Sequence, residues 1–287
     1  MPAWDTVAIV GVGLIGGSIG LALRERKLAR QVIGIGRRRE SLEQALSRGC
    51  ITQISTSVPE GVKQAQLVVV CTPVELIPRH VAEAAAAAPA GCLITDAGST
   101  KAQLVADAEK ALTAKFPQMV PFVGSHPIAG SERNGPEAAQ ADLFAGRVVV
   151  MTPTERTDPA AAAAIEEFWR LLGADVMKMD PEAHDAVIAR TSHLPHLVAA
   201  ALALTTPQDG DCRPLIGNGW SDTTRIASGD PELWRQIFLA NRGPTLNALA
   251  DFETVLRTWR HALESGDGQL LTQLLKEGKS RRDAVGS

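Results

Sequence analysis

The stretch 7–20, VAIVGVGLIGGSIG, constrains the fold of this chain more than any other feature. Apolar residues typical of a buried strand lead into a turn with three glycines, Gly11, Gly13 and Gly16, and a helix start rich in small residues follows. This order of strand, tight turn and helix is the fingerprint of a dinucleotide-binding unit. The alternative is a glycine-rich turn without a ligand, and the clean strand directly before the turn argues against it.

Each part of the fingerprint has a physical role. Gly11 makes the tight turn, Gly13 lets the backbone approach a pyrophosphate, and Gly16 lets the helix pack closely on the strand. Free N–H groups at the helix start, at Leu14 and Ile15, together with the positive end of the helix dipole, favour phosphate. We therefore predict that these five residues bind the cofactor.

The composition is that of an ordinary globular protein. The 287 residues are 45% hydrophobic and 21% charged, and their length suits two domains, each with its own core. No uninterrupted apolar segment is long enough to cross a bilayer, and residues 1–5 carry no export signal, so a cytoplasmic protein is expected.

Charge and cysteine content narrow the partners. The net charge is −3, and the only basic run is a short arginine cluster, which argues against nucleic acid or a membrane surface as a partner. The four cysteines at 50, 71, 92 and 212 show neither a CxxC pair nor a metal-ligand spacing. Buried reduced thiols and no metal site are therefore predicted.

Strands alternate with helices up to about residue 180. Beyond the first, strands are predicted at 31–36, 67–71, 92–95, 120–123, 147–151 and 175–179, with helices between most of them. This alternation predicts an α/β fold with a parallel sheet and right-handed crossovers, a Rossmann-type domain over 1–180. In such sheets, ligands bind outside the carboxyl ends of the strands.

The residues at the end of the second strand decide whether the unit prefers NAD, with a 2′-hydroxyl on its ribose, or NADP, with a 2′-phosphate. An NAD-binding unit usually has an acidic residue there, about 20 residues beyond the fingerprint, but this chain has Gly36 followed by Arg37 and Arg38. A guanidinium pairs with a 2′-phosphate, whereas a carboxylate repels it. NADP is thus favoured and NAD remains possible, because the arginines could simply form a solvated helix start.

Other polar residues follow later strands. Thr72 and Pro73 come after the strand 67–71, and Asp96 and Ser99 follow the strand 92–95, so all four are expected at the ligand edge of the sheet. Ser99 has a second interpretation, as the N-cap of a helix over 101–115.

His126 is the candidate general base. It stands in a loop between the predicted strand 120–123 and Pro127, on the ligand side, and an unperturbed imidazole titrates near neutral pH. A structural or solvated histidine is the alternative.

The last third, 181–287, is predicted to be helical, with Asp180 as an N-cap and Pro181 at the first helical position. Pro195 is expected to kink the helix 181–205. His193 and His196 share a face of it, and a metal would lack a third ligand. Arg225, in a polar loop, could be a surface residue.

Five motifs in register resemble the prephenate/arogenate dehydrogenase family of tyrosine biosynthesis, over roughly residues 6–280. They are GVGLIGGS at 11–18, DAGSTK at 96–101, HPIAGSE at 126–132, SHLPH at 192–196, and TRIA at 224–227 with Asp230, Pro231 and Trp234. The resemblance implies a Rossmann-type domain followed by an all-helical dimerisation domain over 181–287, and hence a homodimer.

The resemblance also implies an oxidative decarboxylation in which a nicotinamide cofactor takes a hydride from the ring carbon that bears the 4-hydroxyl group. It implies that His126 accepts the hydroxyl proton, that Ser99 orients His126, and that Arg225 binds a substrate carboxylate. His193 and His196 are assigned to the substrate, and His196 favours prephenate over arogenate. An arogenate dehydrogenase, which makes tyrosine, or a broad cyclohexadienyl dehydrogenase is the alternative within the family. Should arogenate prove preferred, Asp185 is the candidate for meeting its ammonium group.

Two other classes of protein remain as alternatives. Another two-domain dehydrogenase, of the β-hydroxyacid or pyrroline-carboxylate reductase type, would carry its catalytic lysine, serine or threonine in the helical domain. A redox sensor that binds a dinucleotide without chemistry would have no use for His126, Ser99 and Arg225 together.

Overall fold

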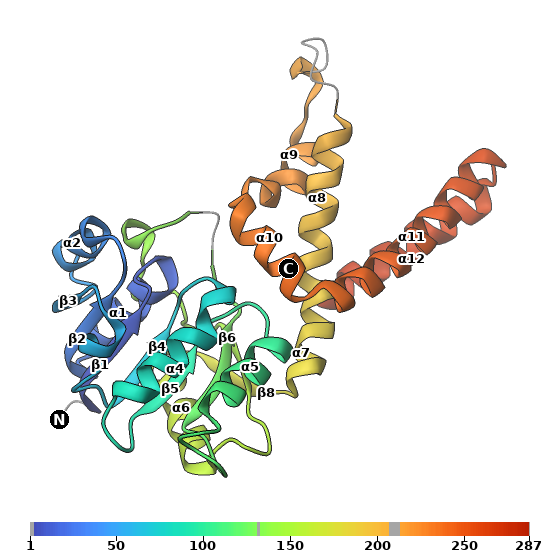
Figure 1. The fold of residues 1–287 in the computed structure, drawn as a ribbon. Coiled ribbons are helices and arrows are strands. Elements are labelled where there is room, and N and C mark those ends of the chain that lie inside the picture. The colour runs from blue at the N-terminus through green and yellow to red at the C-terminus, as the bar shows by residue number, and fades with distance from the viewer. Residues whose placement is uncertain (1–2, 131–132, 207–212, 287) are drawn as a thin grey trace. The chain divides into compact units, whose positions relative to one another are not determined.

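The computed structural model describes residues 3–130, 133–206 and 213–286 (Figure 1). The chain forms two compact units, Met1–Asn241 and Arg242–Ser287, and each is described by itself. Of the residues discussed above, Ser131, Glu132 and Cys212 lie outside the described residues.

The first unit contains an eight-stranded sheet with the order β3-β2-β1-β4-β5-β6-β7-β8. The strands are β1 (Trp4–Val10), β2 (Ala29–Ile35), β3 (Gln53–Ser55), β4 (Leu67–Val70), β5 (Leu93–Asp96), β6 (Phe122–Pro127), β7 (Val148–Thr152) and β8 (Asp175–Lys178). This order, with β1 beside both β2 and β4, is doubly wound, as in the Rossmann-type domain predicted from the sequence.

The prediction of a parallel sheet was wrong at one place. β7 runs antiparallel to β6, with His126 opposite Val150, while the other neighbouring strands are parallel. The connection between β6 and β7 contains only a short 3-10 turn, η2 (Pro136–Ala138), in the part that the structure describes. A parallel return needs a crossover, which is usually a helix.

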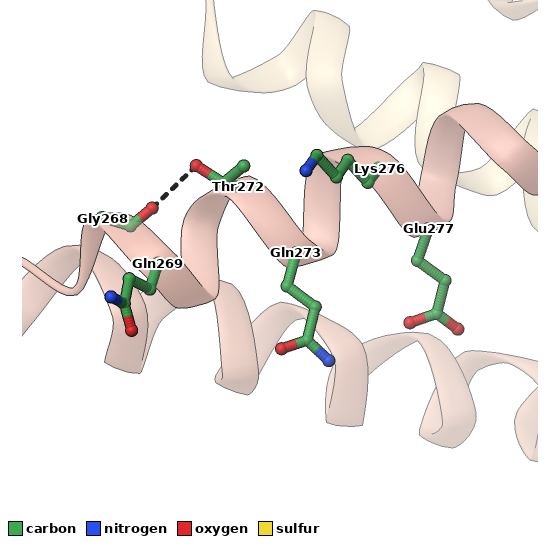
Figure 2. Close-up of a pocket in the computed structure, with 6 residues that line it drawn as sticks. All are labelled: Gly268, Gln269, Thr272, Gln273, Lys276 and Glu277. Atoms are coloured by element: carbon green, nitrogen blue, oxygen red, sulfur yellow. Dashed lines mark hydrogen bonds between the residues drawn. The ribbon is translucent and has the colours of Figure 1, made fainter.

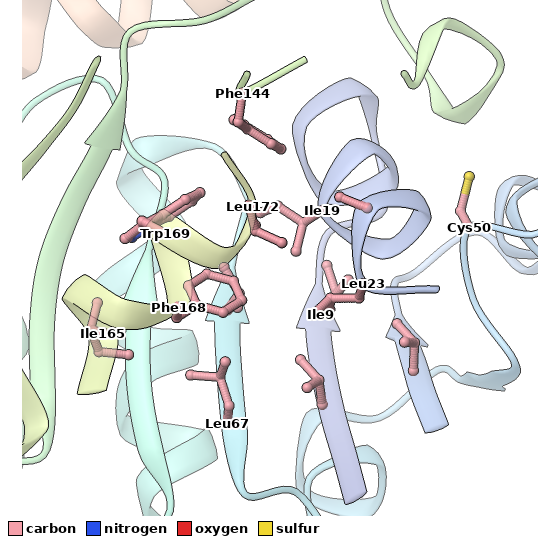
Figure 3. Close-up of a cluster of buried hydrophobic side chains, with 14 of the residues drawn as sticks. Ile9, Ile19, Leu23, Cys50, Leu67, Phe144, Ile165, Phe168, Trp169 and Leu172 are labelled. Carbon is pink, nitrogen blue, oxygen red and sulfur yellow. The ribbon is translucent and has the colours of Figure 1, made fainter. Parts of the chain in front are cut away.

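Helices cover both faces of the sheet. They are α1 (Leu14–Glu25), α2 (Arg39–Ser47), α3 (Val58–Gly61), η1 (Val74–Leu76), α4 (Ile77–Ala87), α5 (Ala102–Leu112) and α6 (Pro159–Leu171). Alternate residues of β1 pack into two cores. Val7 and Ile9 pack with α1, α2 and α6, and Figure 3 shows Ile9 close to Ile19 and Leu23 of α1. Ala8 and Val10 pack with α3, α4 and α5.

The rest of the first unit is helical, as predicted. It comprises α7 (Pro181–Ile188), the π-helical turn η3 (Ala189–His193), α8 (Leu194–Thr205), η4 (Arg213–Leu215), α9 (Asn218–Thr224), η5 (Arg225–Ser228) and α10 (Pro231–Ala240). Asp180 caps α7 by accepting hydrogen bonds from the backbone N–H groups of Glu182 and Ala183, each at 3.0 Å. The π-helical turn interrupts the α-helix directly before Pro195, where the sequence predicted a kink.

The second unit consists of two helices, α11 (Arg242–Glu264) and α12 (Gly268–Val285). Asp267 caps α12 through bonds from the N–H groups of Gln269 and Leu270, at 3.0 and 2.9 Å. Both helices expose large apolar side chains, including Leu263 and Leu275. Such surface is typical of helices that pack against further protein.

One helical run would pass for a membrane span by length and composition alone. Pro181–Thr205 has a mean hydropathy of 1.3 in its most apolar window, and 28% of that window is buried. However, the run contains His184, Asp185 and His193, which are buried and hydrogen-bonded within the first unit. Ionisable groups held in this way are typical of a helix packed against protein.

Candidate active site

The glycines of the fingerprint stand as the sequence predicts. Gly11 has φ +93°, and a Cβ there would lie 2.7 Å from the carbonyl oxygen of Cys71. A Cβ at Gly16 would lie 2.2 Å from the carbonyl oxygen of Gly11, so only glycine lets α1 pack this closely on β1. Gly13 faces open space, which leaves room for a ligand to approach the backbone.

A pocket of about 740 Å³ opens over this turn, at the carboxyl ends of β1, β2 and β4. The predicted cofactor residues that line it are Gly11, Gly13, Arg37, Arg38, Thr72 and Pro73. Leu14, Ile15 and Gly16 do not line it and instead form the first turn of α1, where the first intrahelical bond runs from Gly17 N to Gly13 O. Their N–H groups precede that bond and are the donors that a helix start offers to phosphate.

The sequence did not point to four other residues that line this pocket. Arg79 and His80, at the start of α4, line it together with Thr56 and Ser57. His80 Nδ1 lies 3.0 Å from the Thr72 hydroxyl. Burial lowers the pKa of His80, and the neighbouring Arg79 and Arg37 lower it further, against the opposing effect of Glu83. None of these four residues belongs to a motif of the sequence, so only the fold shows that they line the pocket.

His126 lies within β6 and not in a loop, which corrects the sequence prediction. Its ladder partner in β7 keeps its backbone in place, and its side chain is half-buried. His126 Nδ1 lies 2.9 Å from Nε2 of His184, and His184 Nδ1 lies 2.8 Å from an Oδ1 atom of Asp185. The sequence missed this row, whose other two members come from α7, with His184 58 residues further along the chain than His126.

Asp185 ends this row and also caps α5. Its two carboxylate oxygens accept hydrogen bonds from the backbone N–H groups of Lys101 and Ala102, at 2.8 and 2.9 Å. Lys101 is the N-cap position of α5, so the interpretation of Ser99 as the N-cap was wrong. Because Asp185 is buried and occupied in this way, it is also not placed to meet a substrate ammonium group, as considered above.

The row relates the tautomers of the two histidines. A carboxylate only accepts, so His184 carries a proton on Nδ1, and with that single proton it presents a bare Nε2. His126 then donates from Nδ1, which leaves its own Nε2 as an acceptor. Burial lowers the pKa of His126 well below the usual value, and His184, Lys101 and His193 add to the effect. His126 is thus a neutral imidazole able to accept a proton at Nε2.

A buried ion pair between Lys101 and Asp96 is hydrogen-bonded to the backbone of β6. Lys101 Nζ bonds to the Asp96 carboxylate and donates to the carbonyl oxygen of Ser125 at 2.9 Å, and Asp96 accepts from Ser125 N at 3.0 Å. Both charged side chains are fully buried. Burial lowers the pKa of Lys101, while the facing Asp96 opposes that shift. The pair therefore positions the residue directly before His126.

Ser99 is half-buried in the turn after β5. Within the described residues, the partner that holds His126 Nδ1 is His184, and no hydrogen bond joins Ser99 to His126. The proposed orienting action of Ser99 therefore stays a prediction.

His193 and His196 lie together, as their spacing predicts, in an aromatic cluster with Trp234 and Phe238 of α10. Trp234 stacks on His196 at 3.5 Å between ring centres and 12° between planes. Both histidines are buried, and burial lowers the pKa of each, that of His193 to about 4. His196 Nδ1 is buried without a hydrogen-bond partner among the described residues, so its hydrogen-bonding capacity is unused in this structure.

Arg225 begins the 3-10 helix η5 directly after α9, so the prediction of a polar loop around it was wrong, and its side chain is exposed. η5 packs against α8, the helix that carries His196. The assignment of Arg225 to a substrate carboxylate stays a prediction.

A shallow depression on the second unit is lined by α12 alone, with Gln269, Gln273 and Lys276 beside the bond from the Thr272 hydroxyl to the Gly268 carbonyl oxygen, and it gathers no catalytic groups (Figure 2). In the described ranges, no group of three or more His, Cys, Asp or Glu residues is arranged to hold a metal ion.

Two family models match the chain. Residues 19–178 match the nucleotide-binding domain of prephenate dehydrogenase, and residues 180–277 match its dimerization domain. These models meet near the boundary predicted at 180, whereas the compact units separate after Asn241, so that boundary stays a prediction.

Named relatives are similar over nearly the whole chain. A prephenate dehydrogenase of Bacillus subtilis is 35% identical, over 98% of this chain and 76% of its own length. A cyclohexadienyl dehydrogenase of Zymomonas mobilis is 32% identical, over 99% and 97%. The crystal structure of the A. aeolicus prephenate dehydrogenase with hydroxyphenyl propionate and NAD+ has a TM-score of 0.88 at 34% identity and covers 98% of both chains. With these matches and this site geometry, the chain belongs to the prephenate/arogenate dehydrogenase family.

Proposed function

We propose that this protein is a prephenate dehydrogenase, which converts prephenate and a nicotinamide dinucleotide to 4-hydroxyphenylpyruvate, CO2 and the reduced dinucleotide. The observation that carries the proposal is the row Asp185–His184–His126, which leaves His126 Nε2 as a neutral acceptor. Removing the proton of the 4-hydroxyl group while that carbon becomes a carbonyl needs such a base.

The cofactor fits the residues present. The open space at Gly13, the free N–H groups at the start of α1 and the pocket beyond them suit a pyrophosphate and an adenosine group. When bound, the nicotinamide ring supplies the acceptor for a hydride. The chain's own contribution is to take the hydroxyl proton at His126 Nε2 and, in our proposal, to hold the substrate through Arg225 and His196.

We further propose that NADP is preferred over NAD. Arg39 is paired with Glu43 at 2.9 Å, whereas Arg37 and Arg38 line the pocket, and no carboxylate stands at Gly36. An arginine beside the ribose favours a 2′-phosphate. The A. aeolicus structure contains NAD+, so this preference is a property that we assign to the present chain.

Prephenate is proposed over arogenate because His196 is buried and its pKa is lowered, so that its neutral ring suits an uncharged keto group better than an ammonium group.

A homodimer is proposed because α8 and α10 expose Leu204 (85%) and Leu239 (58%), and the second family model is a dimerization domain. Light scattering should then give twice the chain mass of 30.4 kDa. A cytoplasmic location and the lack of nucleic-acid or membrane partners stay predictions from the sequence.

The direct test is an assay of the purified protein with prephenate or arogenate and either cofactor, following dinucleotide reduction by absorbance and release of CO2. Reduction together with CO2 release from prephenate supports the proposal. Reduction with arogenate alone would select the arogenate activity, and comparable reduction with both substrates would select the broad cyclohexadienyl dehydrogenase activity. No reduction with either would leave a dinucleotide-binding protein without this chemistry.

A further inference from the structure

Asn241, the residue directly after α10, belongs to none of the motifs above, yet it contacts two site residues. It is 2% exposed. Its amide nitrogen donates to the backbone carbonyl oxygen of Asp185 at 2.8 Å and lies 3.0 Å from His193 Nδ1. We propose that Asn241 is a positioning residue that holds His193 as the tautomer with its proton on Nε2, so that His193 acts as a hydrogen-bond donor and not as a base.

The two contacts assign the hydrogens. A backbone carbonyl oxygen only accepts, so the Asn241 atom facing Asp185 is the NH2 group. The same nitrogen faces His193 Nδ1, and an amide NH2 only donates, so His193 Nδ1 accepts. A neutral imidazole whose Nδ1 accepts carries its proton on Nε2. The pKa of His193, lowered to about 4, keeps the ring neutral above that pH.

His193 and His126 therefore have opposite polarity, and Asp185 is common to both. Its carboxylate ends the row that leaves His126 Nε2 bare, and its carbonyl oxygen holds the amide that gives His193 its Nε2 proton. A base and a donor are thereby kept apart in one site of neutral histidines. The tautomer of His193 is independent of the reaction, whereas its use toward an oxygen of the substrate rests on the proposed function.

The tautomer can be read directly by NMR. In two-bond ¹⁵N–¹H spectra of ¹⁵N-labelled protein at pH 7.5, the six histidines give separate patterns, and a His193→Gln variant identifies that of His193. We expect an unprotonated Nδ1 and a protonated Nε2 for His193 in the unmodified protein. A protonated Nδ1 would overturn the proposal whatever the activity, so this measurement does not depend on the substrate assignment.

Variants test whether Asn241 is the cause. Asn241→Asp replaces the donor with an acceptor, so His193 Nδ1 should become protonated, and the KM for prephenate should rise about tenfold or more while kcat changes less. Gln273→Glu makes the same amide-to-acid change on the exposed surface of α12 and should alter neither spectrum nor KM (Figure 2). If Asn241→Asp does not fold, Asn241→Leu serves, with loss of the single Nε2-protonated form expected. An unchanged His193 pattern in a folded Asn241 variant would refute the role.

Discussion

At the scale of single residues, the proposed chemistry depends on one nitrogen atom, Nε2 of His126. His126→Asn removes the proton acceptor but lies outside the residues that line the dinucleotide pocket. We expect kcat to fall by about 10²–10⁴, the usual contribution of a positioned base, with cofactor affinity nearly unchanged. Steady-state kinetics and a cofactor titration check this. A variant with near-normal kcat would remove His126 from the mechanism.

Arg37 decides the cofactor preference in our proposal. Losing a charge-assisted hydrogen bond to the 2′-phosphate costs about 1.5–3 kcal/mol, or roughly ten- to a hundredfold in affinity. Arg37→Ala should thus lower the affinity for NADP by that factor and leave the affinity for NAD almost unchanged, as measured by fluorescence titration. The matched control is Arg39→Ala, because Arg39 pairs with Glu43 and should not affect either cofactor. Equal losses of NADP and NAD affinity in Arg37→Ala would show that the arginines are a solvated helix start.

Arg225 is predicted to bind a substrate carboxylate. Truncating a residue of this kind typically costs about 2–5 kcal/mol. Since the side chain is exposed in the described structure, we expect the lower end of that range, as a rise in the KM for prephenate with a smaller effect on kcat. An unchanged KM would identify Arg225 as a surface residue.

At the scale of elements, two glycines of one turn are expected to have different roles, Gly16 in stability and Gly13 in cofactor binding. A Cβ at Gly16 would meet the Gly11 carbonyl oxygen, so Gly16→Ala must push α1 away from β1, at a cost of about 1–3 kcal/mol or more in the free energy of unfolding. Gly13→Ala meets nothing within 4 Å and should keep the stability but lose cofactor affinity. Urea unfolding and cofactor titration of both variants check this. Equal stability losses would contradict the assignment.

How far the elements follow from the sequence depends on how local their causes are. The turn at Gly11 and the cap at Asp180 follow from a few adjacent residues, and both were predicted correctly. β3 was missed because its three residues form a strand only through pairing with β2. The direction of β7 was missed because it depends on the path of the connection before it, which no periodicity records.

The site was predictable where a residue has a motif around it. His126 and the cofactor turn have such motifs, and the sequence named both as candidates. The sequence did not name His184, and it named Asp185 only for a substrate ammonium group, because their contacts arise from the packing of α7 on α5, and Asp185 caps a helix that begins 83 positions earlier. Neither an imidazole nor a carboxylate one turn inside a helix signals such a contact. Asn241 was missed because its contacts with Asp185 and His193 also arise only from packing.

At the scale of the whole molecule, buried neutral histidines make stability depend on pH. The pKa of His193 is about 4, below its unfolded value of 6.5, so the unfolded chain binds a proton between these values that the folded chain does not. The contribution of His193 to the free energy of unfolding is greatest above about pH 6.5. It is lost as the pH falls toward 4, and the total loss is about 3 kcal/mol. His126, His80 and His196, whose pKa values are also lowered, act in the same direction.

Urea unfolding at pH 7.5 and 4.5 measures this effect. We expect a clear loss of stability at the lower pH and a smaller loss in His193→Gln, which has no proton to take up at this position. A His193→Gln curve with the same pH dependence as that of the unmodified protein would show that other groups dominate acid unfolding.

The double use of Asp185 limits how this protein can be cut and recombined. A split at the predicted boundary would place His126 in one fragment, and its orienting partner and the cap of α5 in the other. A chimera with the helical part of a distant homologue would keep the dinucleotide pocket but lose the two residues that orient His126. Residues 1–241 should therefore be exchanged together, so that Asp185 and both groups it contacts stay in one piece.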